Sequence, residues 1–122
     1  MNITLFSFGF KHGYAEADTV WDVRFLPNPY WVPELRAHTG LEAPVAAYVL
    51  ENKTGCEFLV HFEPFLFFIL RSHKAAGRKE LTLAVGCTGG RHRSVAVIDH
   101  LQKIIADRGF DLNVYHRDIT KE

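Results

Sequence analysis

The segment from Leu81 to Arg108 constrains the fold more than any other part of the chain. Leu81–Gly86 is a short apolar run with β-branched residues, which predicts a strand covered on both faces. A glycine-rich segment follows, and from Ser94 to Arg108 apolar residues recur at the spacing of an amphipathic helix that Gly109 would close. A strand that leads through a loop into a helix is typical of a parallel sheet with helices packed on it.

The rest of the chain contains elements of the same two kinds. We expect strands at Ile3–Phe8, Thr19–Phe25 and Leu112–Tyr115, and helices at Val45–Asn52 and Glu57–Ala75. The last of these helices has apolar residues on nearly all sides, so we expect it to be largely buried. Leu26–Pro44 contains four prolines and is predicted to be a long ordered loop rather than a helix. The sequence therefore predicts one α/β domain over residues 1–122, with three layers and helices on the faces of a small, mostly parallel sheet of about four strands.

Composition limits the classes of function. Fourteen Lys and Arg residues balance fourteen Asp and Glu residues, so no overall field attracts nucleic acid or an anionic membrane, and any anion site must be local. The longest apolar run, residues 65–70, is far shorter than the roughly 18 residues of a membrane span. The first residues do not resemble a signal peptide, which predicts a cytoplasmic protein. The cysteines and histidines are scattered, so we expect no metal and no cofactor.

The loop between the predicted strand and helix is the main candidate for a functional site. It consists of Cys87, Thr88, Gly89, Gly90, Arg91, His92, Arg93 and Ser94. In this position backbone N–H groups converge and the helix dipole favours negative charge. The glycines would let a ligand approach closely, while the arginines, the histidine and the serine would donate hydrogen bonds. We therefore predict that the loop binds a phosphate group.

The same loop permits a second chemistry. Cys87 and Arg93-Ser94 have the Cys-x5-Arg-Ser spacing of protein tyrosine phosphatases, in which a thiolate attacks phosphorus, and a helix N-terminus beside arginines favours a thiolate. However, Gly86 stands where that family usually has histidine. No aspartate stands out as a general acid, and the candidates are Asp22, Asp111 and Asp118. A cysteine-dependent phosphatase therefore remains the alternative to a ligand site without catalysis. The Gly-Lys-Ser/Thr ending of a Walker A loop is absent, so nucleotide hydrolysis has no support.

Three blocks of residues resemble the C-terminal domain of the RapZ RNase adaptor proteins. They are Phe6–Gly13, Asp22–Pro29 and Gly86–Val95, and shorter matches are Leu35-Arg36, Thr39–Leu41 and His116–Asp118. The resemblance implies an α/β domain that senses glucosamine-6-phosphate and, in enterobacterial members, binds a small regulatory RNA and presents it to RNase E. It also implies that the loop of residues 87–94 would hold the sugar phosphate.

The resemblance also implies that residues at the end of the second strand border the same pocket, and residues after the first strand would reach the same edge; open α/β sheets generally bind ligands at the carboxyl ends of their strands. These residues are Lys11, His12, Asp22, Arg24, Asn28 and Tyr30. Tyr30 and Trp31 are candidates for exposed contacts with a sugar or a base.

The partners expected are a small phosphorylated ligand such as glucosamine-6-phosphate, an RNA or a ribonuclease, and a second copy of the chain. An RNA adaptor would act through basic residues such as Lys103, Arg108, Arg117 and Lys121. The chain lacks both the kinase-like N-terminal domain of the full-length family and a basic C-terminal run, so weak affinity for an RNA backbone is expected. Cys56 and the phenylalanines of residues 58–68 belong either to the core or, if exposed, to a self-association surface.

Overall fold

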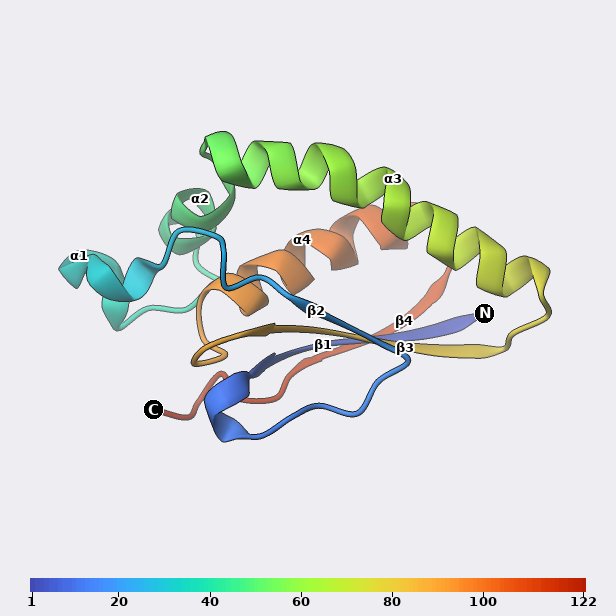
Figure 1. The fold of residues 1–122 in the computed structure, drawn as a ribbon, viewed down its shortest axis with the longest axis horizontal. Helices are drawn as coiled ribbons and strands as arrows, with labels where there is room; N and C mark the ends of the chain where they lie inside the picture. Colours follow the sequence, from blue (N-terminus) through green and yellow to red (C-terminus); the bar gives the residue numbers. More distant parts are fainter.

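The centre of the fold is a sheet of four parallel strands, which a computed structural model of residues 1–122 describes (Figure 1). The strands are β1 (Asn2–Gly9), β2 (Thr19–Asp22), β3 (Glu80–Cys87) and β4 (Asp111–His116), in the spatial order β2-β3-β1-β4. Because all strands run the same way, their carboxyl ends meet at one end of the sheet, called here the carboxyl edge, and their amino ends meet at the amino edge.

Helices lie over one face of this sheet. They are α1 (Pro33–Arg36), α2 (Ala43–Leu50), α3 (Lys53–Ala75) and α4 (Arg93–Ala106), with 3-10 turns η1 (Phe10–His12) and η2 (Pro29–Trp31). Figure 1 shows α4 directly above the strands and α3 above α4. The opposite face is covered by the segment between β1 and β2, whose Phe10, Ala15 and Ala17 pack against the sheet.

The alternation of side chains in β1 explains its apolar sequence. Ile3 and Leu5 point into the large core shared with α3 and α4. Phe6 and Phe8 point to the other face, where they form a small cluster with Ala84. Both faces are buried, so the strand has no polar side as an exposed strand would.

The predicted α/β domain with a small parallel sheet is confirmed, and the differences lie in the connections. Helices occupy one face of the sheet, and a loop forms the layer on the other. β2 ends at Asp22 rather than Phe25, because the chain turns after the Val23 amide has bonded to the Gly86 carbonyl at 2.9 Å. The predicted loop Leu26–Pro44 contains η2, α1 and the start of α2. Prolines stand in the first turn of all three, a position where the missing N–H costs nothing.

The expectation that residues 57–75 form a largely buried helix was wrong for one side of α3. Phe62, Leu66 and Leu70 are buried against the core. Three apolar residues on the outer side are exposed, and these are Val60, Phe65 and Phe68. The reason is that α3 lies in the outermost layer and has a neighbour on one side only (Figure 1). Self-association through this side stays a prediction.

No helix is both long and apolar enough to cross a membrane.

Candidate functional site

A pocket of about 760 Å³ opens at the carboxyl edge of the sheet. Its walls come from η1 after β1, the segment 28–37 after β2, the loop 87–93 after β3 and the end of the chain after β4. Ten of the predicted site residues line it, namely Lys11, Asn28, Tyr30 and residues 87–93. The topology therefore brings the predicted phosphate loop together with side chains from two distant segments.

Two glycines allow the loop to lie directly on the end of β1. Gly90 has a φ of 80°, and a Cβ atom there would stand 2.5 Å from the Gly9 amide nitrogen. A Cβ atom on Gly9 would in turn meet the Gly89 carbonyl oxygen at 2.5 Å. Any larger residue at either position would push the loop away from the strand.

The backbone N–H groups of this loop are available to a ligand. The amides of residues 88–95 donate no hydrogen bond to a protein acceptor, and the first such bond of α4 runs from the Ala96 amide to the His92 carbonyl at 3.0 Å. Helix starts leave these amides without a partner, and the helix dipole adds a partial positive charge there. An anion at this position would accept hydrogen bonds from the free amides and would be attracted by the partial positive charge.

Arg93 is held beneath the loop. Its side chain is buried, and one terminal nitrogen donates to the Arg24 carbonyl at 2.6 Å and the Leu26 carbonyl at 3.4 Å. The other donates to the Thr88 hydroxyl at 3.4 Å. The Nε of Arg93 has no acceptor although it is buried. Arg93 therefore fixes the segment after β2 and keeps one charged donor unused.

His92 connects the loop to α1 rather than supplying a charge. Its Nε2 donates to the Arg36 carbonyl at 3.0 Å. Burial lowers the pKa of His92, with its hydrogen bonds to backbone carbonyls opposing and the nearby arginines adding to the effect. The ring is therefore neutral at pH 7, and the positive charge of the loop comes from Arg91 and Arg93.

Cys87 forms part of the pocket floor. Its thiol is buried and lies 3.1 Å from the Ser94 hydroxyl. Ser94 is fully buried below the loop and does not line the pocket. The pair ties the last residue of β3 to the first turn of α4.

The lining carries more positive than negative charge. Its cations are Lys11, Arg36, Arg91 and Arg93, and its one acidic side chain is Glu122. The whole chain has a net charge of zero at pH 7, so this excess is local. A pocket of this kind attracts an anionic ligand without drawing anions to the rest of the surface.

Three predicted residues lie beside the pocket and do not line it. Asp22 and Arg24 form an exposed ion pair at 2.7 Å, with the Arg24 guanidinium over the Phe10 ring at 4.3 Å. Only the backbone carbonyl of Arg24 reaches the site, through Arg93. His12 lies in η1, where its buried Nε2 has no partner.

The segment 28–37 contributes more residues than the sequence indicated. Trp31, Pro33, Arg36 and Ala37 join Asn28 and Tyr30 in the lining. Arg36 donates to the Tyr30 carbonyl at 2.6 Å and lies over the Tyr30 ring at 4.8 Å. The Tyr30 amide donates to Asn28 at 3.1 Å, and the Tyr30 and Trp31 rings form a T-shaped pair. In the sequence, this wall was indicated by a proline-rich stretch with two aromatic residues, by the end of the Asp22–Pro29 block and by the Leu35-Arg36 match.

Comparisons with known proteins agree with the resemblance in the sequence. The profile of the family described as RapZ C-terminal domain matches residues 1–120. A protein of Corynebacterium glutamicum named nucleotide-binding protein is 52% identical over 122 residues, which cover 98% of this chain and 40% of that protein. A protein of Nitratidesulfovibrio vulgaris with the same name is 49% identical over 118 residues, 96% of this chain and 40% of that protein. The chain thus spans about 40% of the length of these relatives and matches their C-terminal part.

Proposed function

The chain belongs to the family of RapZ C-terminal domains, and we propose that it is a regulatory module that binds a phosphorylated amino sugar, of the kind of glucosamine-6-phosphate, in the pocket at the carboxyl edge. The phosphate would lie on the loop 88–93, and the sugar would extend toward the segment 28–37. Bound ligand would then alter how the domain meets a partner.

The observation that carries this proposal is the set of unpartnered donors in the loop. The amides of residues 88–95 lack protein acceptors, and the buried Nε of Arg93 lacks one as well. Unsatisfied buried donors are costly unless a ligand or water accepts from them. A phosphate has enough oxygen acceptors for several such donors, and Lys11 and Arg91 add charge on the same side.

The opposite wall supports a sugar rather than bare phosphate. Tyr30 and Trp31 are 49% and 72% exposed, yet both are fixed in position by contacts with Arg36 and each other. Exposed aromatic faces that line a pocket suit the apolar face of a sugar ring. Glu122 is the acidic side chain of the lining and would accept from the amino group.

The relatives are named nucleotide-binding proteins, and this name describes chains of which the present one spans about 40%. The loop has no Walker ending, so we assign the sugar phosphate to this pocket and no nucleotide chemistry.

The proposed partner is an RNA or a ribonuclease. The basic residues first considered for RNA are largely occupied, since Arg117 and Lys121 pair with Asp118 and Lys103 pairs with Asp99. A protein partner therefore agrees better with the surface.

A cysteine-dependent phosphatase remains the second candidate because of one contact. The Cys87 thiol lies in the pocket floor 3.1 Å from the Ser94 hydroxyl, which could stabilise a thiolate. No aspartate lines the pocket as a general acid, which disfavours it. If Cys87→Ser abolishes release of phosphate from an aryl phosphate, the enzyme is supported; if the native chain releases none, it is rejected.

Calorimetric titration with glucosamine-6-phosphate, glucosamine and inorganic phosphate tests the main proposal. Lys11 is exposed, lines the pocket and makes no side-chain hydrogen bond, so Lys11→Ala should weaken sugar phosphate binding about tenfold without affecting the fold. Lys79→Ala removes an exposed lysine just before β3, at the amino edge, and is the matched control. Binding that is equal in both variants, or that glucosamine alone reproduces, would contradict the proposal.

A further inference from the structure

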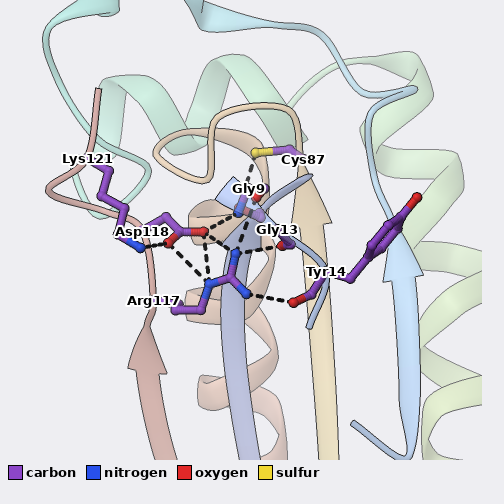
Figure 2. A network of polar contacts seen from close by, with 8 residues as sticks. Gly9, Gly13, Tyr14, Cys87, Arg117, Asp118 and Lys121 are labelled. Carbon is purple, nitrogen blue, oxygen red and sulfur yellow. Dashed lines mark hydrogen bonds and ion pairs between the residues drawn. The ribbon is translucent and has the colours of Figure 1, made fainter. Parts of the chain in front are cut away.

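An ion pair with a buried carboxylate follows β4 and lies directly behind the pocket. Asp118 is fully buried, accepts the Gly9 amide at 2.7 Å and pairs with Arg117 at 2.8 Å. Lys121 adds a third contact at 2.7 Å. Figure 2 shows Asp118 between these two cations, with the end of β1 beside it. None of these side chains lines the pocket, so the pair is not part of the proposed contact surface.

Arg117 determines the path of the chain after β1. Its guanidinium donates to the carbonyls of Gly13 at 2.8 Å, Tyr14 at 3.1 Å and Gly9 at 3.4 Å (Figure 2). Few other polar bonds hold this turn. One of them runs from the Lys11 amide to the Thr88 carbonyl at 3.1 Å, which joins the turn to the loop. Because this turn places Lys11 in the pocket lining, Arg117 helps to determine where the Lys11 side chain lies.

The same tail supports the loop from behind. A Cβ atom on Gly90 would stand 3.0 Å from the Asp118 Cβ, so the loop lies against this residue. Arg91 donates through Nε to the Ile119 carbonyl at 3.1 Å. Three segments far apart in sequence therefore meet at one buried carboxylate: the turn after β1, the loop after β3 and the tail after β4.

We propose that Arg117 and Asp118 are the positioning pair of the ligand site, which hold Lys11 and the loop 88–91 in the geometry that receives the phosphate. The inference rests on the proposed function for its ligand, and on the contacts above for its structure. It assigns to the His116–Asp118 block a role other than the two considered from sequence, in which Arg117 was a candidate RNA contact and Asp118 a candidate general acid.

The charges of the pair make this support specific. Burial acts to raise the pKa of Asp118, but hydrogen bonds from Arg117, the Gly9 amide and Lys121 outweigh it and lower the pKa to about 2. The carboxylate is therefore ionised at neutral pH. Asp118→Asn keeps the shape and one acceptor for Gly9, but places an amide N–H₂ among cationic donors. Arg117→Lys keeps the charge and loses the planar fork that reaches several carbonyls.

Asp18 supplies a matched control. It also accepts a backbone amide, that of Thr82 at 2.8 Å, and also pairs with an arginine, Arg78. It lies just before β2, away from the carboxyl edge, and its side chain is 32% exposed. Asp18→Asn therefore removes a carboxylate with the same two kinds of contact at a position outside the proposed ligand site.

The experiment measures two quantities in the full chain, at a temperature where circular dichroism shows every variant folded. The first is affinity for glucosamine-6-phosphate and inorganic phosphate. The second is amide hydrogen exchange without ligand. Asp118→Asn and Arg117→Lys should lose at least about tenfold in affinity and exchange faster at the hydrogen-bonded amides of Gly9, Lys11 and Gly13. Asp18→Asn should keep its affinity within about twofold and leave these amides protected.

Each other result has a defined meaning. Native affinity and native protection in both variants would overturn the inference, as would faster exchange spread over the whole sheet. If the native chain binds neither ligand, the proposed function fails, while faster exchange of the two variants confined to the amides of Gly9, Lys11 and Gly13 still supports the positioning pair. If Asp118→Asn does not fold, Arg117→Lys decides by the same two measurements.

Discussion

The two edges of the sheet contain the same kinds of contact and use them differently. Toward the amino edge, Asp18 and Arg78 form a partly exposed pair, and Gly77 turns the chain with a φ of 84° and no atom near its Cβ position. At the carboxyl edge, the fully buried Asp118 pairs with a half-buried Arg117, and Gly90 turns with a φ of 80° against the atoms of β1. The segments at the amino edge are joined by partly exposed contacts such as that of Asp18 with Arg78, whereas the carboxyl edge is one interlocked structure around a buried carboxylate.

This difference explains why the site lies where it does. Interlocking costs free energy, because polar groups must be buried, and proteins retain such features mainly where geometry has a function. The parallel topology concentrates the connections after the strands on this edge. The same kind of substitution should therefore reduce stability more at the carboxyl edge than at the amino edge.

The largest expected difference concerns the two glycines. Gly77→Ala incurs only the left-handed backbone strain and should destabilise by about 1 kcal/mol. Gly90→Ala adds a clash with the Gly9 amide nitrogen at 2.5 Å and should cost at least about 3 kcal/mol and abolish ligand binding. Urea unfolding of both variants measures the two values. Equal losses of unfolding free energy in the two variants would show that the loop can move away from β1. They would contradict the proposed difference between the two edges.

The second difference concerns the arginines. Arg93→Met leaves the carbonyls of Arg24 and Leu26 without their donor and should cost on the order of 2 to 3 kcal/mol. Arg78→Met breaks an exposed pair and should cost less than about 1 kcal/mol. The free energy of unfolding of each variant, taken from denaturant curves, tests this order. If Arg93→Met lost less unfolding free energy than Arg78→Met, the segment after β2 would not depend on Arg93.

The strand-loop-helix unit was predictable from sequence because its signals are local. An apolar run, a pair of glycines and the helical spacing from residue 94 define it without knowledge of the rest of the chain. The wall of residues 28–37 was harder, since prolines that start short helices look the same in sequence as prolines that exclude them. The residues assigned to the loop proved to differ in role, since residues 87–93 line the pocket whereas Ser94 is fully buried below it.

The positioning pair had no local signal at all. An arginine and an aspartate after a strand normally form a solvated turn, and Asp118 is buried only because β4 lies beside β1 while the loop after β3 covers both. That arrangement depends on contacts between residues about a hundred positions apart. Sequence patterns of one chain do not contain this information.

A third, smaller difference should appear in the pH dependence of stability. The pKa of Asp118 is about 2 in the folded chain and 3.8 when unperturbed, so its contribution is complete above pH 4 and is lost as pH falls toward 2. The loss is worth about 2 kcal/mol. Urea unfolding across this range should show a decline in the native chain and in Asp18→Asn that is larger by about this amount than the decline in Asp118→Asn, in which Asp22 and Glu42, whose pKa values are also lowered, still contribute. An unchanged decline in Asp118→Asn would assign it to other carboxylates.

His92, which is buried, and His116, which is half-buried, add an earlier phase to the same curve. Burial lowers the pKa of both His92 and His116 below 6.5. As pH falls below about 6.5, the unfolded chain takes up protons first, so stability declines until the folded pKa values are passed. This phase should persist in Asp118→Asn.

The smallest expected effect on stability concerns the exposed rim of the carboxyl edge. Trp31 is 72% exposed, so Trp31→Ala should change the free energy of unfolding by no more than about 0.5 kcal/mol. If its ring packs on the sugar, the same substitution should weaken glucosamine-6-phosphate binding about tenfold and leave inorganic phosphate binding unchanged. Tyr14→Ala removes a 90% exposed ring on the same edge but outside the pocket, and it should change neither affinity. A loss of stability in Trp31→Ala would mean that the rim belongs to the interlocked structure rather than to the ligand surface.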